Sequence, residues 1–89
     1  MRREEAESLA LQGLAFLAAD ERRLGALLAQ SSWTLAELRA GAADGEVLAG
    51  ILDFLLADEK LLLAFSEEVG VAPGRITHAR AALPGRGLD

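Results

Sequence analysis

The sequence predicts an all-α fold, a compact six-helix domain made of two pseudo-symmetric three-helix repeats. Alanine and leucine supply much of the chain and favour helices, whereas β-branched residues are few and aromatic residues make up 4% of it. Apolar residues recur with the spacing of one helical face. A 13-residue stretch also occurs twice, which indicates that the helices form a repeated unit.

The repeated stretch comprises residues 14–26 and 52–64, at an offset of 38 positions. Eight of the 13 aligned positions are identical. The identical pairs are Leu14/Leu52, Phe16/Phe54, Leu17/Leu55, Ala19/Ala57, Asp20/Asp58, Glu21/Glu59, Leu24/Leu62 and Ala26/Ala64. Because neither three-helix unit has enough apolar surface to fold well alone, we expect the two units to share one core about a pseudo-two-fold axis.

We expect one domain over residues 1–89, a usual size for a single domain. The first repeat is expected at 4–41 and the second at 45–84, with a joint near Gly41 to Gly45. Residues 85–89 are expected to form a flexible tail.

The first repeat opens with a helix over about residues 4–19, whose apolar residues lie along one face. Asp20 has the position of an N-cap for a second helix that extends to about Gln30. Thr34 and Glu37 form a capping-box pattern, which predicts a short third helix.

The second repeat follows the same order. A fourth helix is expected over about residues 46–57, and Asp58 then caps a fifth helix. That helix stops at Gly70, a residue type common just after a helix end. Pro73 suits the first turn of a sixth helix, and Pro84 ends it.

Gly13 and Gly50 lie inside predicted helices, where glycine lowers the helix propensity. We expect both glycines to allow a close backbone approach between the first and fourth helices.

Composition and charge exclude several classes of protein. A formal net charge of −5 disfavours nonspecific binding to nucleic acid or anionic membranes. The absence of cysteine excludes disulfides and thiolate metal sites. No stretch approaches membrane-spanning length, and the N-terminus lacks the apolar run of a secretory signal, so we expect a soluble cytoplasmic protein. Eight arginines against one lysine, with no asparagine, indicate GC-rich bacterial codon usage.

Two acidic pairs, Asp20–Glu21 and Asp58–Glu59, are the most conspicuous polar feature. Four carboxylates at equivalent helix starts could gather around a metal ion or a cationic partner. Helix capping explains both the residue type and the position, and no histidine or cysteine accompanies the pairs. We therefore expect helix caps and no metal ligands.

His78 is the only histidine, and its neighbours Thr77 and Arg80 do not include the carboxylate that would orient a general base. No glycine-rich phosphate loop with its lysine is present in the sequence. The sequence therefore predicts no catalytic residue, no cofactor site and no enzymatic activity.

Residues 66–80 resemble a helix-turn-helix pattern, with a small residue, a glycine four places on and apolar residues after it. In this alternative, Arg75, Thr77, His78 and Arg80 would face the major groove of DNA. Two glutamates near the phosphates and the lack of a basic footprint argue against it. The repeat also explains the segment as the second copy of an ordinary helical corner.

Surplus apolar residues favour an interaction surface. Leu11 lies off the main face of its helix, and Leu61, Leu62 and Leu63 cannot all point inward from one helix. The leading hypothesis is a non-catalytic protein-interaction or scaffolding domain. Its partner would be an unidentified protein or, in the simplest case, a second copy in a homodimer.

The stretch 54–65, the opening helix 4–17 and the closing segment 79–85 resemble a family of about ninety-residue bacterial proteins catalogued as a domain of unknown function. The resemblance covers nearly the whole chain, and the acidic dipeptide that follows the phenylalanine is its most specific mark. It implies a small helical protein in the bacterial cytoplasm, and it implies no activity, ligand or catalytic residue.

Overall fold

A computed structural model describes residues 1–41 and 45–83, and the regular secondary structure of these residues is entirely helical. The helices are α1 (Arg3–Ala18), α2 (Glu21–Ser31), α3 (Leu35–Ala40), α4 (Gly45–Leu56), α5 (Glu59–Val69) and α6 (Pro73–Ala82). They form a compact body with extents of 29 × 25 × 22 Å, which confirms the prediction of an all-α, six-helix fold. Residues 42–44 of the expected joint near Gly41 to Gly45 lie outside the described residues, as do Pro84, which was expected to end the sixth helix, and the expected tail at 85–89.

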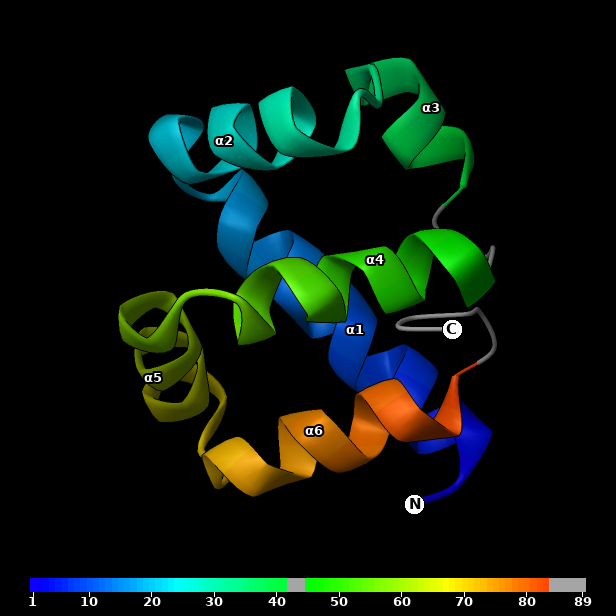
Figure 1. Cartoon of the computed structure of the whole chain (residues 1–89), viewed down its shortest axis with the longest axis vertical. Helices are drawn as coiled ribbons and strands as arrows, with labels where there is room; N and C mark the ends of the chain where they lie inside the picture. The colour runs from blue at the N-terminus through cyan, green and yellow to red at the C-terminus, as the bar shows by residue number, and fades with distance from the viewer. Residues whose placement is uncertain (42–44, 84–89) are drawn as a thin grey trace.

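The helices α1 and α4 cross in the middle of the molecule, and α6 packs against both of them (Figure 1). Each central helix is followed by a helix that packs back on it, α2 on α1 and α5 on α4. The short helix α3 lies beyond the end of α2, on the opposite side of the molecule from α6 (Figure 1).

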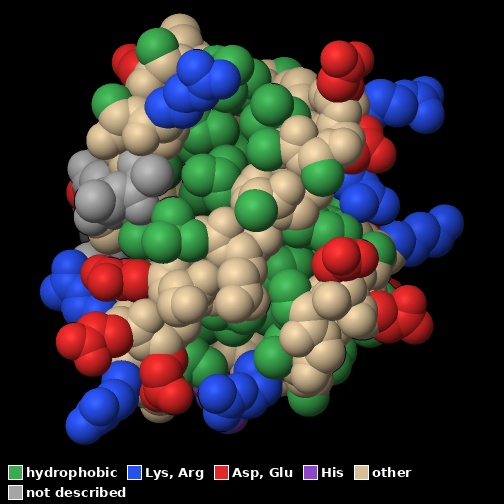
Figure 2. All heavy atoms as spheres, turned by 180° about the vertical axis from the view of Figure 1, so that it is seen from behind, with side chains coloured by type: hydrophobic (Ala, Val, Ile, Leu, Met, Phe, Trp, Pro, Cys, Tyr) green, Lys and Arg blue, Asp and Glu red, His purple; other side chains and the backbone are tan. Residues whose placement is uncertain are grey.

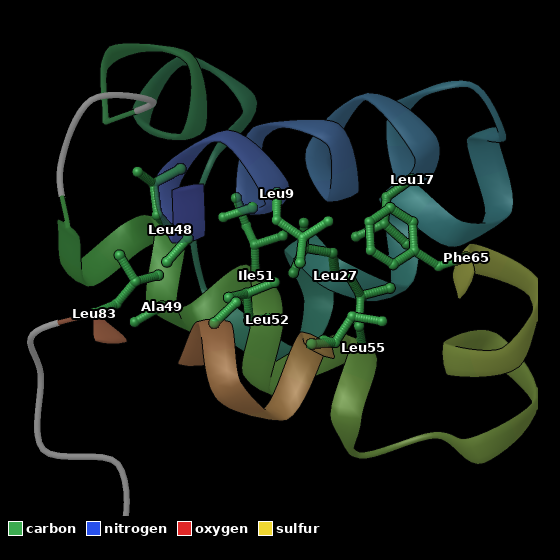
Figure 3. Packing of buried hydrophobic residues seen from close by; sticks show 14 of the residues in the cluster. Leu9, Leu17, Leu27, Leu48, Ala49, Ile51, Leu52, Leu55, Phe65 and Leu83 are labelled. Atoms are coloured by element: carbon green, nitrogen blue, oxygen red, sulfur yellow. The ribbon is translucent and has the colours of Figure 1, made fainter. Parts of the chain in front are cut away.

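The core lies between the two central helices and the inner faces of the others (Figure 3). Complete burial of a leucine, isoleucine or phenylalanine side chain contributes roughly 1.5–3 kcal/mol. The largest side chains with almost no exposed surface are Leu17, Leu27, Leu38, Leu48, Ile51, Leu52, Leu55, Phe65 and Ile76. Every helix supplies at least one of them, so the single core holds all six helices together.

Three of the predicted helix caps are present. The Asp20 carboxylate accepts hydrogen bonds from the backbone N–H groups of Arg22 and Arg23 at 2.9 and 3.3 Å. The Asp58 carboxylate accepts one from the N–H of Leu61 at 3.2 Å. At the start of α3, the hydroxyl of Thr34 accepts from the N–H of Glu37, whose carboxylate accepts from the N–H of Thr34. Each cap satisfies donors that the first turn of a helix leaves without a partner.

Helix boundaries recur at the 38-residue offset of the sequence. The bounds of α5 are those of α2 shifted by 38 residues, and α3 and α6 start at positions that differ by the same number. Both α2 and α5 end at a left-handed residue, Ser32 with φ 66° and Gly70 with φ 72°. The surroundings of the last helices differ, since α6 packs along α1 and α4 and extends four residues further than the equivalent end of α3.

The two helix glycines have different neighbours. A Cβ atom on Gly13 would lie 2.9 Å from Cδ1 of Leu55 and 3.4 Å from Cγ2 of Ile51, so Gly13 does allow the close approach of α1 to α4. A Cβ atom on Gly50 would instead lie 2.7 Å from Cη2 of Trp33. The expectation that Gly50 faces the first helix is therefore wrong, because its side of α4 is covered by the indole that precedes α3.

Within the described part of the chain, no helix has both the length and the apolar character needed to cross a membrane.

We expect Gly13→Ala to lower the free energy of unfolding. Alanine gains about 1 kcal/mol of helix propensity, but a methyl group forced against the fully buried Leu55 costs about 1–3 kcal/mol. Chemical denaturation should therefore show a net loss of about 1 kcal/mol. Gly25→Ala in α2 is the matched control, because a Cβ atom there would meet nothing within 4 Å and should give the full propensity gain. Equal gains in both variants would contradict the close approach at Gly13.

We expect Ser66→Ala to stabilise the protein. Ser66 is buried in α5, and its hydroxyl oxygen has no hydrogen-bond partner among the described residues. Because a buried unsatisfied polar group costs about 1–3 kcal/mol, its removal should raise the free energy of unfolding by about 1 kcal/mol or more. The exposed Ser8 of α1 provides the comparison, since Ser8→Ala changes only the helix propensity. A gain no larger than that of Ser8→Ala would show that the hydroxyl is satisfied in solution.

Candidate functional site

The two acidic pairs occupy the starts of α2 and α5, and their aspartates cap these helices. Glu21 and Glu59 lie in the first turns and are exposed. Within residues 1–41 and 45–83, no group of three or more acidic, histidine or cysteine side chains could hold a metal ion. The structure nevertheless brings Asp20 and Asp58 together, because both line one groove on the surface.

This groove, the central groove, has a volume of about 470 Å³. Both capped helix starts border it, because the capping residues Asp20 and Asp58 line it. It is lined by Asp20, Arg22, Arg23, Ala26, Phe54, Asp58, Lys60 and Leu61. The pairs Asp20/Asp58, Arg22/Lys60 and Arg23/Leu61 are 38 residues apart, so the two ends of the groove have equivalent positions in the sequence.

Two further grooves flank the central groove and are named here after their phenylalanines. The Phe16 groove has a volume of about 490 Å³ and shares Asp20 and Arg23 with the central groove. The Phe54 groove has a volume of about 300 Å³ and shares Phe54 with it.

The lining residues of the two flanking grooves correspond at the same offset. The pairs are Gln12/Gly50, Ala15/Asp53, Phe16/Phe54, Ala19/Ala57, Gln30/Glu68 and Ser31/Val69. Six positions of each groove therefore have an equivalent in the other, although the residue types differ at four of them.

The aromatic ring is covered in the Phe16 groove. The guanidinium carbon of Arg23 lies 4.6 Å from the centroid of the Phe16 ring, within the range of a cation–π contact. The same ring packs on Phe65 with centroids 5.4 Å apart. Arg23 also approaches Asp20 at 3.9 Å, so two contacts hold it in this position.

The Phe54 groove has no such cover. The position equivalent to Arg23 is Leu61, and among the described residues no cation lies over Phe54. Phe54 and Trp33 are both half-buried and border the groove, and the buried Leu27 also lines it. This groove therefore offers an apolar surface between two aromatic side chains.

The proposed DNA-contacting residues do not form one accessible face. The segment does contain two helices joined by a three-residue turn, and Arg75, Thr77 and His78 are exposed on α6. Arg80 instead donates a hydrogen bond from Nε to the Asp53 carboxylate at 2.7 Å, and only 15% of its side chain is exposed. Arg80 therefore joins α6 to α4.

The predicted surplus of apolar surface is present in part. Leu11 is 43% exposed and Leu63 is 47% exposed, whereas Leu61 and Leu62 are half-buried against the core. Figure 2 views the molecule from behind, relative to Figure 1. On this face, apolar side chains lie along the middle and charged side chains lie toward the edges.

Sequence reasoning did not find the Phe54 groove. Its lining residues come from two segments that are far apart in the chain, residues 27–33 at the end of α2 and after it, and residues 50–57 in α4 and just beyond it. Two signals for it were present: Trp33 is the only tryptophan, and Phe54 is the repeat counterpart of Phe16.

Comparison with known proteins identifies one family. The family described as "Protein of unknown function (DUF3572)" matches residues 3–86 of the 89-residue chain. No curated protein and no solved structure matches the chain.

Proposed function

We propose that this chain, which belongs to the family of proteins of unknown function described as DUF3572, is a small non-catalytic protein-interaction or scaffolding domain. The observation that carries the proposal is the Phe54 groove, where Trp33 and Phe54 border an open apolar surface beside a charged groove. Tryptophan and other aromatic side chains supply much of the binding energy at protein interfaces. The exposed Leu11 and Leu63 add apolar surface outside the groove.

We propose further that the fold consists of two pseudo-symmetric repeats related by a two-fold axis through the central groove. Three observations support this arrangement: α5 has the bounds of α2 shifted by 38 residues, an aspartate caps each of the two helices, and the lining residues of the flanking grooves correspond. Because α3 and α6 pack differently, the proposed two-fold symmetry applies to the first two helices of each repeat.

We also propose a bacterial, cytoplasmic setting for the protein. The support is compositional: eight arginines against one lysine and no asparagine are typical of GC-rich bacterial coding sequences.

Binding of nucleic acid through residues 66–80 is the alternative function. The exposed Arg75, Thr77 and His78 favour it, while the ion pair of Arg80 and the net charge of −5 oppose it. This alternative is therefore kept as one outcome of the test.

A photo-crosslinking residue at Ala57 tests the proposal. Ala57 is exposed and lines the Phe54 groove, and Ala81, exposed on α6, is the matched control position. We expect illumination of cells that express the two variants to yield a discrete crosslinked protein from position 57 and none from position 81. Trp33→Ala should remove this product, because it removes one aromatic border of the groove.

Other results would change the assignment. Crosslinks between two copies of the chain would identify a homodimer, and crosslinks to nucleic acid from position 81 would favour the alternative. Identical products from both positions, or none from position 57, would contradict an interaction surface at the Phe54 groove.

A further inference from the structure

We infer that the Phe54 groove and the central groove together bind an acidic peptide segment of a partner protein. One apolar side chain of the segment lies between Trp33 and Phe54, and a carboxylate lies beside Arg22 and Lys60. This inference rests on the proposed interaction function and adds to it the chemistry of the partner.

The central groove and the Phe54 groove are adjacent along α2 and are together called the track. The N-terminal half of α2 borders the central groove, and its C-terminal half borders the Phe54 groove. Phe54 lines both grooves, so they adjoin the same side chain. An 11-residue helix is about 16 Å long, which matches roughly five residues of extended peptide.

The Phe54 groove has the size and lining of a side-chain pocket. Its volume of about 300 Å³ lies at the lower end of the roughly 300–1,000 Å³ typical of small-molecule sites. The indole of Trp33 lies against the bare backbone of Gly50, where a Cβ atom would be 2.7 Å from the ring. The absence of a side chain at Gly50 thus lets Trp33 form a preformed border, and a preformed pocket lowers the ordering cost of binding.

Three cationic side chains and two carboxylates line the central groove, so its lining is more positive than the chain as a whole, which carries −5. The carboxylates of Asp20 and Asp58 already accept hydrogen bonds from backbone N–H groups at the helix starts. Within the described ranges, neither Arg22 nor Lys60 makes an ion pair, so both can receive a carboxylate of a ligand.

The Phe16 groove indicates how many peptides each chain can bind. In this equivalent groove, Arg23 lies over the ring of Phe16 and is held there by Asp20 as well. An apolar side chain would have to displace this cation before it reached the ring. Among the described residues a cation lies over Phe16 and none lies over Phe54, so we expect one peptide to bind each chain, at the Phe54 groove.

The track also distinguishes between partners. A nucleic acid would bring phosphates but no aliphatic or aromatic side chain for the space between Trp33 and Phe54. An acidic segment with a single apolar anchor satisfies both the charge and the apolar surface of the track.

Trp33 reports on the pocket directly, because it is the only tryptophan of the chain. The probes are three pools of hexapeptides without tryptophan. In the acidic pool, each peptide has one phenylalanine among aspartates and glutamates. In the lysine pool, the other residues are lysines, and in the alanine pool, alanine replaces the phenylalanine of the acidic pool. We expect only the first pool to shift the Trp33 emission with a saturable 1:1 titration. The lysine pool and the alanine pool should bind at least tenfold more weakly.

Two variants separate the charge from the apolar anchor. The double variant Arg22→Ala, Lys60→Ala should weaken binding of the acidic pool about tenfold and reduce its salt dependence, whereas Arg39→Ala on the exposed face of α3 should not. Ala57→Glu should block the pocket and abolish the emission shift. Circular dichroism of each variant should show the helical content of the unaltered chain.

Several results would overturn the inference: no saturable shift with the acidic pool, equal or tighter binding of the lysine pool, or full affinity in the double variant. An emission shift on concentration of the protein alone would assign the groove to a second copy instead. If the crosslink from position 57 persists while acidic peptides fail to bind, the interaction function stands and the partner chemistry is wrong. Loss of both results would remove the interaction function as well.

Discussion

The crossing of α1 and α4 at Gly13 is the contact on which the positions of the other helices depend. Side chains of Ile51, Leu55 and Phe65 surround the space that a Cβ atom on Gly13 would occupy. Because α2 follows α1 after two residues and α5 follows α4 after two residues, the crossing also fixes where these helices begin. The crossing thereby brings Asp20 and Asp58 to the same groove.

The capping aspartates connect this architecture to the surface chemistry. Each aspartate is needed to satisfy the first turn of its helix, so its negative charge is largely directed at the backbone. The neighbouring Arg22 and Lys60 are then the groups that an incoming ligand meets. Local geometry, rather than net charge, thus makes the central groove favourable for a carboxylate in an acidic protein.

Local sequence patterns were sufficient to predict the helices, whereas the grooves depend on contacts between residues that are distant in the sequence. Caps such as Asp20 and Thr34 act within three residues of chain, so their sequence patterns were sufficient to predict the starts of α2 and α3. Gln30 and Asp53 both line the Phe54 groove although they lie far apart in the sequence. The ion pair of Arg80 likewise connects α6 with α4. No local sequence pattern encodes either of these long-range contacts. The predicted role of Gly50 was wrong because its contact with Trp33 forms only in the folded chain.

The two equivalent grooves should differ in ligand binding, and backbone NMR spectra can measure this difference residue by residue. Upon addition of the acidic phenylalanine pool, we expect the amide signals of Gly50 and Ala57 and the indole signal of Trp33 to move. The equivalent signals of Gln12 and Ala19 in the Phe16 groove should stay in place, because Arg23 covers Phe16. Equal movement in both grooves, or movement in the Phe16 groove alone, would show that Arg23 does not block the Phe16 groove and that the Phe54 groove is not the preferred site.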